Sequence, residues 1–113
     1  WGGRVYYCEE PRQVEGTSKI QTYEYKMLNY LIQGSAADAT KEAMIRYFKN
    51  KSRQSGRLLL NVHDELLGSC PKTDVKREMK ALKESMESVE LDVPLLTDGS
   101  SGSNWEAMEE YKD

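Results

Sequence analysis

Residues 58–71, LLLNVHDELLGSCP, decide how the middle of the chain folds, because they set a histidine and two carboxylates between two short aliphatic runs. Residues 58–62 are too few for a helix in this setting and are typical of a β-strand, and residues 66–70 are typical of its partner. His63, Asp64 and Glu65 then fall at the bend, and Pro71 ends the second strand. The sequence therefore predicts a β-hairpin over residues 57–70 with a charged tip.

This charged tip allows two interpretations. Adjacent carboxylates repel one another, and beside a low-dielectric sheet both lose hydration. A divalent cation relieves that repulsion, and Mg²⁺ commonly takes one or two carboxylates together with substrate phosphates. An ordinary solvated turn is the alternative, because Asp side chains bond the local backbone of turns and a lone histidine is more often a surface or packing residue than a ligand. From these residues alone both interpretations stay open.

Helices are predicted on both sides of the hairpin. Over residues 23–50, apolar and small side chains recur at helical spacing, with polar side chains largely off that stripe. The stripe consists of Leu28, Ile32, Ala36, Ala39, Ala43 and Tyr47. A second amphipathic helix is predicted over residues 72–90, with Thr73 as its N-cap. Its stripe consists of Val75, Met79, Leu82, Met86 and Val89.

The ends of the chain carry weaker patterns. Residues 4–8 and 91–98 suggest short strands, and residues 104–113 suggest a terminal helical turn anchored by Trp105. The order of helix, hairpin, helix and strand predicts an α+β fold in which helices pack on one face of a small antiparallel sheet.

Composition limits the class of protein. The 113 residues are enough for one soluble domain with a modest core, and their formal net charge of −3 gives no overall attraction to nucleic acid. Cys8 and Cys70 have no CxxC spacing, which indicates free thiols in a reducing compartment. The longest apolar run falls far short of the roughly 20 residues that a membrane span needs. Because the chain begins with Trp1, we expect a piece of a longer protein.

A second group of polar residues lies on the first predicted helix, in the sequence NYLIQGSAADATKEAMI of residues 29–45. Asn29 and Gln33 are four positions apart, so their amides project from one helical face. Gly34 costs a helix about 1 kcal/mol relative to Ala, which close approach of a backbone or a ligand would justify. Such amides suit the minor-groove edges of base pairs, where contact can be independent of sequence. Tight helix packing with both amides merely solvated is the alternative.

QGSAAD in the helix and VHDE in the hairpin, followed by LDVPLLTDGSSGSNW, resemble in order and spacing the C-terminal end of family A DNA polymerases, the group of bacterial DNA polymerase I and many phage replicative enzymes. The resemblance extends from about Gly3 to Trp105. It implies a C-terminal palm segment of a DNA-directed DNA polymerase. In that segment residues 1–22 connect fingers and palm, 23–50 form the long helix, 57–70 the motif C hairpin between two long helices, 72–90 a helix, and 91–113 a C-terminal strand and tail.

The resemblance also implies roles for the residues of the hairpin. Asp64 matches one of the two carboxylates that hold the catalytic Mg²⁺ ions. Glu65 matches the neighbouring acid, which lies near the metals and is less consistently a direct ligand. Both are expected as catalytic and metal-binding residues. His63 matches a histidine close to the primer terminus and is expected to bind nucleic acid.

The resemblance assigns further nucleic-acid contacts to the first 33 residues. Asn29 and Gln33 match helix amides that contact the minor groove of the primer–template near the active site. Arg4, together with Gly3, matches more weakly a G-R pair that follows the fingers. Tyr25 stands where relatives often carry an arginine facing the primer, which puts one such contact in doubt.

The implied reaction is template-directed addition of deoxynucleotides to a primer 3′ end by two-metal phosphoryl transfer. The implied partners are primer–template DNA, deoxynucleoside triphosphates and an upstream polymerase part with fingers, thumb and motif A, in the same or a separate chain, and no membrane. The two Mg²⁺ ions would be shared with a motif A aspartate outside this chain. The chain alone is therefore expected not to polymerise. The expected location is the cytoplasm of a bacterial or phage-infected cell, or an organelle.

Two functions of other classes stay open beside this one. A non-catalytic module could bind nucleic acid or protein through the long helix, with a purely structural hairpin. A metal nuclease would need more clustered carboxylates or histidines, and His63 is the single histidine of the chain.

Overall fold

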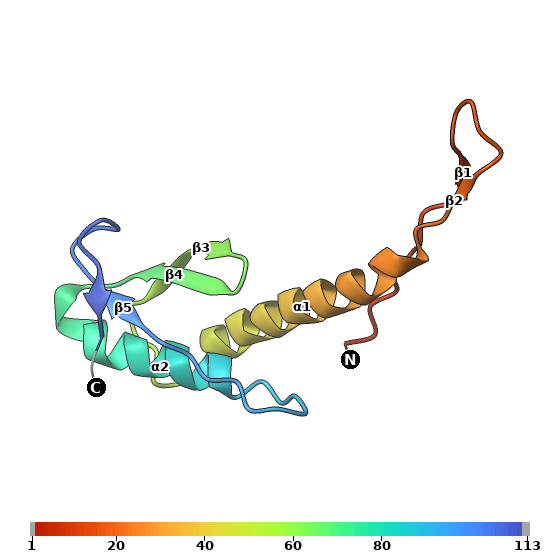
Figure 1. The fold of residues 1–113 in the computed structure, drawn as a ribbon. Coiled ribbons are helices and arrows are strands. Elements are labelled where there is room, and N and C mark those ends of the chain that lie inside the picture. Colours follow the sequence, from red (N-terminus) through yellow and green to blue (C-terminus); the bar gives the residue numbers. More distant parts are fainter. Residues whose placement is uncertain (1, 112–113) are drawn as a thin grey trace. The chain divides into compact units, whose positions relative to one another are not determined.

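The computed structural model describes residues 2–111, which combine helices with short antiparallel strand pairs in an α+β architecture (Figure 1). Each α-helix follows a short 3-10 turn: η1 (Glu24–Lys26) leads into α1 (Met27–Lys49), and η2 (Lys72–Asp74) leads into α2 (Val75–Glu87). The strands pair as β1 (Arg12–Gln13) with β2 (Ile20–Gln21), β3 (Arg57–Val62) with β4 (Glu65–Ser69), and β5 (Ser100–Ser101) with β6 (Glu109–Glu110). Within these residues the strands thus form three separate pairs and not the one small sheet that we expected.

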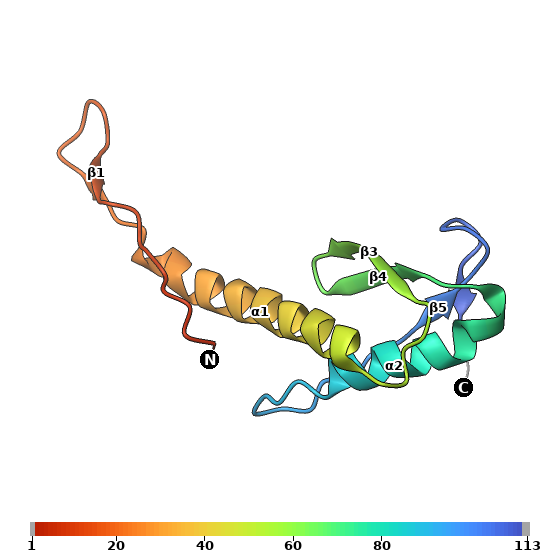
Figure 2. The same cartoon turned by 180° about the vertical axis from the view of Figure 1, so that it is seen from behind.

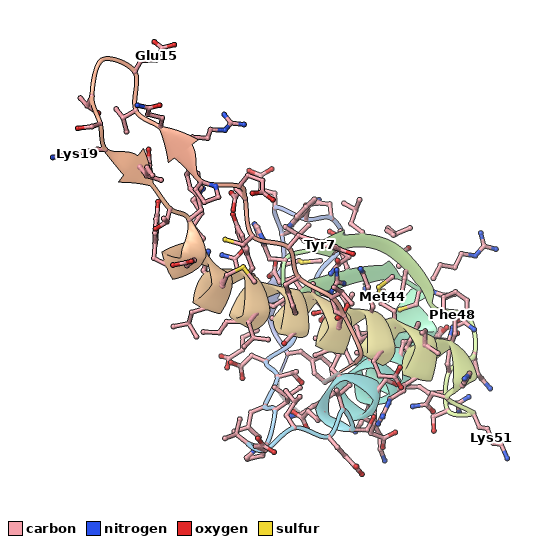
Figure 3. All side chains as sticks on the ribbon, turned by 90° about the vertical axis from the view of Figure 1, so that its right-hand side faces the viewer. Tyr7, Glu15, Lys19, Met44, Phe48 and Lys51 are labelled. Carbon is pink, nitrogen blue, oxygen red and sulfur yellow. The ribbon has the colours of Figure 1, made fainter. Side chains whose placement is uncertain are left out.

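The described residues divide into two compact units, one ending at Asp38 and one beginning at Ala39, with the division inside α1. In the first unit, β1 and β2 form a short hairpin whose connecting loop carries Glu15 and Lys19 (Figure 3). The backbone N–H of Val14 donates to the carbonyl of Lys19 across that loop, at 3.0 Å.

An extended segment, residues 4–9, is attached to the first half of α1 by side chains. Arg4 forms an ion pair with Asp38, and the Tyr6 hydroxyl donates to the carbonyl oxygen of Leu31 at 3.3 Å. The segment carries no strand pairing, so the strand predicted for residues 4–8 is wrong. Side-chain contacts with a helix replace the backbone ladder that a strand would need.

Further contacts hold the other end of this segment. The Glu9 carboxylate accepts hydrogen bonds from the Lys26 ammonium at 3.0 Å and from the Tyr30 hydroxyl at 2.8 Å. These two donors, Lys26 first, lower the pKa of Glu9 to about 2. Residues 4–9 therefore contact α1 at three levels along its first half.

The core of the second unit lies where the end of α1 meets α2, and both ribbon views show these two segments side by side (Figures 1 and 2). Its buried apolar residues are Ala39, Ala43, Tyr47, Ala81 and Val89. Leu66, Met86 and Leu95 pack against this core.

The apolar stripe predicted along α1 is thus correct only in its second half. Ala39, Ala43 and Tyr47 are buried, but Leu28 and Ile32 are 67% and 60% exposed. The first half of the helix faces only the extended segment in its own unit, which is too thin to cover a helix face.

A buried carboxylate connects α2 with the loop before β3. Glu78 accepts hydrogen bonds from the backbone N–H groups of Gln54 (2.7 Å) and Ser55 (2.9 Å) and from the hydroxyl of Tyr47 (2.6 Å). A Cβ at Gly56 would collide with the Tyr47 hydroxyl and the Glu78 carboxylate, so only glycine fits there. Burial raises the pKa of Glu78, but the hydrogen bonds outweigh it and lower that pKa to about 2.

The start of α2 differs from the prediction. Thr73 was expected as the N-cap, but it lies inside η2, and its hydroxyl donates to the carboxylate of Asp74 at 3.2 Å. Asp74 occupies the N-cap position of α2 without a side-chain cap hydrogen bond. The 3-10 turn after Pro71 moves the helix start beyond Thr73.

The C-terminal elements also correct the sequence prediction. Residues 91–98 form a loop, because Pro94 lacks a backbone donor and Thr97 instead donates twice to the Glu87 carboxylate, at 2.9 and 3.0 Å. The terminal helical turn predicted for residues 104–113 is replaced by a turn followed by β6, and residues 112–113 lie outside the described part. Trp105 is 60% exposed and is therefore not the buried anchor that we expected. Neither helix in residues 2–111 has the length and apolar character needed to cross a bilayer.

Candidate functional site

The charged tip predicted from the sequence is the two-residue turn of the β3–β4 hairpin. Val62 pairs with Glu65, so His63 and Asp64 alone connect the two strands. His63 has a φ of 55°, in the left-handed region that hairpin turns usually fill with glycine. His63 thus carries a side chain although its backbone conformation favours glycine.

Asn61 braces this turn. Its side-chain amide donates to the carbonyl oxygens of His63 (3.2 Å) and Glu65 (3.1 Å), one on each side of Asp64. We did not predict a role for Asn61. The signal was present, since Asn side chains often bond backbone groups two residues further on in turns.

The strands beside the turn are more exposed than the sequence suggested. Leu59 and Leu60 are 58% and 48% exposed, and Val62 is 38% exposed. The pairing shifts register between Leu58 and Leu60, a bulge that adds local twist to the hairpin. Only two strands pair here, so one face of the hairpin has no covering layer among the described residues, while Leu66 packs on the core.

Asp64 and Glu65 are correspondingly exposed, so the loss of hydration that we expected for them does not occur in this structure. Among residues 2–111 neither carboxylate has a hydrogen-bond or ion-pair partner. No group of three or more His, Cys, Asp and Glu side chains in the described part could hold a metal ion by itself. Two exposed and unpaired carboxylates do suit Mg²⁺ when phosphates and other groups supply its remaining ligands.

The two predicted helix amides meet on α1. The Gln33 side-chain amide donates to the side-chain oxygen of Asn29 at 3.2 Å, and both residues are exposed. The Asn29 amide nitrogen and the Gln33 oxygen have no partner within the described residues, so one donor and one acceptor face outward.

Gly34 is explained by the chain itself and not by a ligand. A Cβ at Gly34 would lie 2.5 Å from the hydroxyl oxygen and 2.6 Å from Cε1 of Tyr6. The close approach that Gly34 permits is therefore made by the Tyr6 side chain, whose hydroxyl also donates to the carbonyl oxygen of Leu31.

Arg4 is held by an acidic neighbour. Its Nε donates to one oxygen of Asp38 at 2.8 Å and its Nη2 donates to the other, in a bidentate pair. Hydrogen bonding with Asp38, followed by its charge, raises the pKa of Arg4. The Nη1 amino group lies outside this pair.

The predicted residues thus fall into three groups, one in the second unit and two in the first. His63 and Asp64 form the hairpin turn and Glu65 begins the strand that follows it, Asn29 and Gln33 share one helix face, and Arg4 is paired with Asp38. The first group offers anionic oxygens, the second offers amide hydrogen-bond groups, and the third offers a cation that is already partnered.

Comparison with known proteins points to one family. The family described as DNA polymerase family A matches residues 2–107. The thermostable DNA polymerase I of Thermus thermophilus is 40% identical over 111 residues, which cover 97% of this chain and 13% of that protein. DNA polymerase I of Bacillus subtilis is 47% identical over 85 residues, 73% of this chain and 10% of that protein. The chain therefore spans about a tenth of the length of these relatives. No solved structure matches it.

Proposed function

The chain belongs to DNA polymerase family A, and from this premise we propose that it forms the C-terminal portion of the polymerase palm, carrying one share of the catalytic Mg²⁺ site. The observation that carries the proposal is the VHDE hairpin turn, with its two exposed and unpaired carboxylates. Because neither acid has a hydrogen-bond or ion-pair partner within residues 2–111, their oxygens are available to a metal ion.

Asp64 and Glu65 are the residues that would hold Mg²⁺. Bound Mg²⁺ supplies positive charge that lowers the pKa of a primer 3′ hydroxyl and neutralises the phosphates of the incoming nucleotide. The protein's own part is to keep the two carboxylates at a defined place. A two-residue turn braced by Asn61 does this with little freedom.

The primer–template would be contacted by the amide pair on α1. The outward donor of Asn29 can reach the acceptors that every base pair presents in the minor groove, N3 of purines and O2 of pyrimidines. Such contact is independent of sequence, as template-directed synthesis requires. His63, at the tip of the turn, would lie near the primer end, and Arg4 would reach a phosphate only through the N–H groups that Asp38 leaves.

Polymerisation itself is proposed for this chain together with an upstream part. The relatives that it matches are roughly eight to ten times as long as the matched segment, and the family resemblance implies that the second metal aspartate and the nucleotide-binding residues would lie upstream. The substrates would be primer–template DNA and deoxynucleoside triphosphates, and the reaction an in-line displacement at the nucleotide's α-phosphate.

Primer extension tests the proposal. In the assembly of this chain with its upstream part, Asp64→Asn should lower the extension rate by at least ~100-fold, which corresponds to about 2.7 kcal/mol of lost transition-state stabilisation. The affinity for primer–template should change by less than about 2-fold. Asp92→Asn, at another exposed acid, is the matched control and should extend normally.

Two outcomes would contradict the proposal. Near-normal extension by the Asp64→Asn assembly would remove the metal role of the turn. Measurable extension by the 113-residue chain alone, with Mg²⁺, primed template and nucleotides, would show that no upstream part is needed.

A further inference from the structure

A cluster of basic side chains lines an open concavity at the end of the β3–β4 hairpin opposite its turn, because its residues precede β3 and follow β4. Lys51 comes from the turn after α1, and its side chain extends away from the ribbon (Figure 3). Lys76, Arg77 and Lys80 come from the first two turns of α2. We call this concavity, with these four cations, the basic basin. It lies entirely within the second unit.

The charge of the basic basin is largely uncompensated. Lys51, Lys76 and Arg77 are exposed and have no hydrogen-bond or ion-pair partner among residues 2–111. Lys80 approaches Glu84 at 3.9 Å, a long and exposed pair that contributes little. Asp74 is the single acid of the lining. Four cations and one acid give the basin a positive charge, whereas the whole chain has a net charge of −3.

The acid in the basin is already occupied. The carboxylate of Asp74 accepts hydrogen bonds from the hydroxyls of Ser55 and Thr73. One donor lies in the loop before β3 and the other in η2, and within residues 2–111 Asp74 forms no ion pair with the neighbouring cations. The basin remains available to an anion from outside.

The lining matches the groups that bind phosphate oxygens. Phosphates of nucleic acids are contacted mainly by Lys and Arg together with Ser, Thr and Gln side chains, and the basin adds Ser52 and Gln54 to its cations. Lys76 and Lys80 are four residues apart, hence about 6 Å apart along the helix axis. The open concavity has a volume of about 650 Å³, more room than a single small anion needs. A row of cations in such a space suits a chain of phosphates.

We propose that the basic basin binds the phosphodiester backbone of nucleic acid, as a contact separate from the catalytic turn and from the amide pair on α1. The identity of the polyanion rests on the proposed function; the charge and lining of the basin do not. Contact with phosphates would add affinity without reading sequence, and it would weaken steeply with salt because counterions are released on binding.

Fluorescence anisotropy of the 113-residue chain with a fluorescein-labelled 20-base-pair duplex, between 50 and 200 mM KCl, tests this inference. The triple variant Lys51→Glu, Lys76→Glu, Arg77→Glu should lose at least ~10-fold in affinity, and its log–log salt slope should fall by roughly 2 to 3. The matched control Arg12→Glu, Lys19→Glu, Lys41→Glu changes net charge equally, at exposed positions outside the basin. It should stay within about 3-fold of the unmodified chain.

Equal losses in the two triple variants would overturn the inference, since net charge alone would then explain the binding. If the Glu variant loses helix content by circular dichroism, the milder set Lys51→Gln, Lys76→Gln, Arg77→Gln takes its place with the same expected slope change. Phosphatidylserine vesicles are a further arm: competition with the duplex at equal phosphate concentration would assign the basin to a generic anionic surface and overturn the nucleic-acid partner.

The failure of this inference and of the proposed function can be told apart. If Asp64→Asn abolishes extension but the basin triple variant binds the duplex as well as its control does, only the proposed basin contact is contradicted. If Asp64→Asn extends the primer normally but the basin triple variant loses affinity for the duplex, the catalytic role of the turn is contradicted and the basin contact remains.

Discussion

The side-chain amide of Asn61 donates a hydrogen bond of 3.2 Å to the backbone carbonyl of His63, the one non-glycine residue among positions 2–111 with a positive φ. The side-chain amide of Asn61, next to the end of β3, thereby holds His63 in a backbone conformation that costs free energy to maintain. The carboxylate of Asp64 follows directly in the chain, so its position depends on this contact.

Removing the brace should loosen the turn. We expect Asn61→Ala to lower the free energy of unfolding by about 1 kcal/mol, because two exposed hydrogen bonds are lost. In the polymerase assembly it should slow primer extension severalfold. Asn104→Ala is the matched control, since Asn104 accepts a hydrogen bond from the Ala107 N–H in another exposed turn. Normal extension by Asn61→Ala would mean that the turn keeps its shape without the brace.

His63→Gly should separate stability from function. Glycine adopts a positive φ without strain, so the free energy of unfolding should stay equal or rise by up to about 1 kcal/mol. If the imidazole lies near the primer end, extension should nevertheless fall. Urea unfolding and single-turnover extension of the same variant measure the two effects. A variant that is both less stable and fully active would contradict both expectations.

The buried carboxylate of Glu78 makes stability depend on pH. Its pKa is lowered to about 2 in the folded chain, below the value of about 4.5 expected when unfolded. The stabilisation is therefore present above pH 4.5 and is lost as pH falls towards 2. We expect it to reach up to about 3 kcal/mol.

Urea unfolding followed by circular dichroism at pH 7, 4.5 and 3 measures this dependence. Glu78→Gln should be less stable at pH 7 and should show a flatter fall with acid, because its amide cannot accept every hydrogen bond that the carboxylate accepts. Glu9→Gln is the control, since the Glu9 pKa is also lowered to about 2 but the side chain is exposed. Equal acid sensitivity of Glu78→Gln and the unmodified chain would refute the assignment.

Gly34 and Tyr6 should be coupled. Alanine in a helix gains about 1 kcal/mol over glycine, but Gly34→Ala would displace the Tyr6 ring and its hydrogen bond to Leu31. The single change should therefore be near neutral. In a Tyr6→Ala background the same change should stabilise by the full ~1 kcal/mol. A double-mutant cycle by thermal unfolding measures this coupling, and equal effects in the two backgrounds would show that the ring is not in the way.

Some features of the hairpin could be predicted from the sequence because they depend on residues close together in the chain. Strand length and the polar bend predicted the hairpin correctly, because both depend on neighbouring residues, except that Glu65 was expected at the bend and is the first residue of β4. Exposure of Leu59, Leu60 and Val62 depends on whether another layer covers the hairpin, and no local pattern carries that information.

The helices show the same division. The long apolar and small-residue pattern placed α1 well, but it could not show that Leu28 and Ile32 lie in a half without a core. Thr73 looked like an N-cap until the 3-10 turn after Pro71 moved the helix start. The roles of Asp64, Glu65, Asn29 and Gln33 stay predictions, since they concern ligands and partners outside the chain.

The three attachments of residues 4–9 to α1 also suggest an order of folding. Glu9 joins Lys26 across 17 positions, Tyr6 joins Leu31 across 25, and Arg4 joins Asp38 across 34. Loop-closure entropy rises with loop length, so the contact beside the β1–β2 hairpin should close first and the other two should follow towards the chain start. Detachment should follow the reverse order, so that Arg4 leaves Asp38 before Glu9 leaves Lys26.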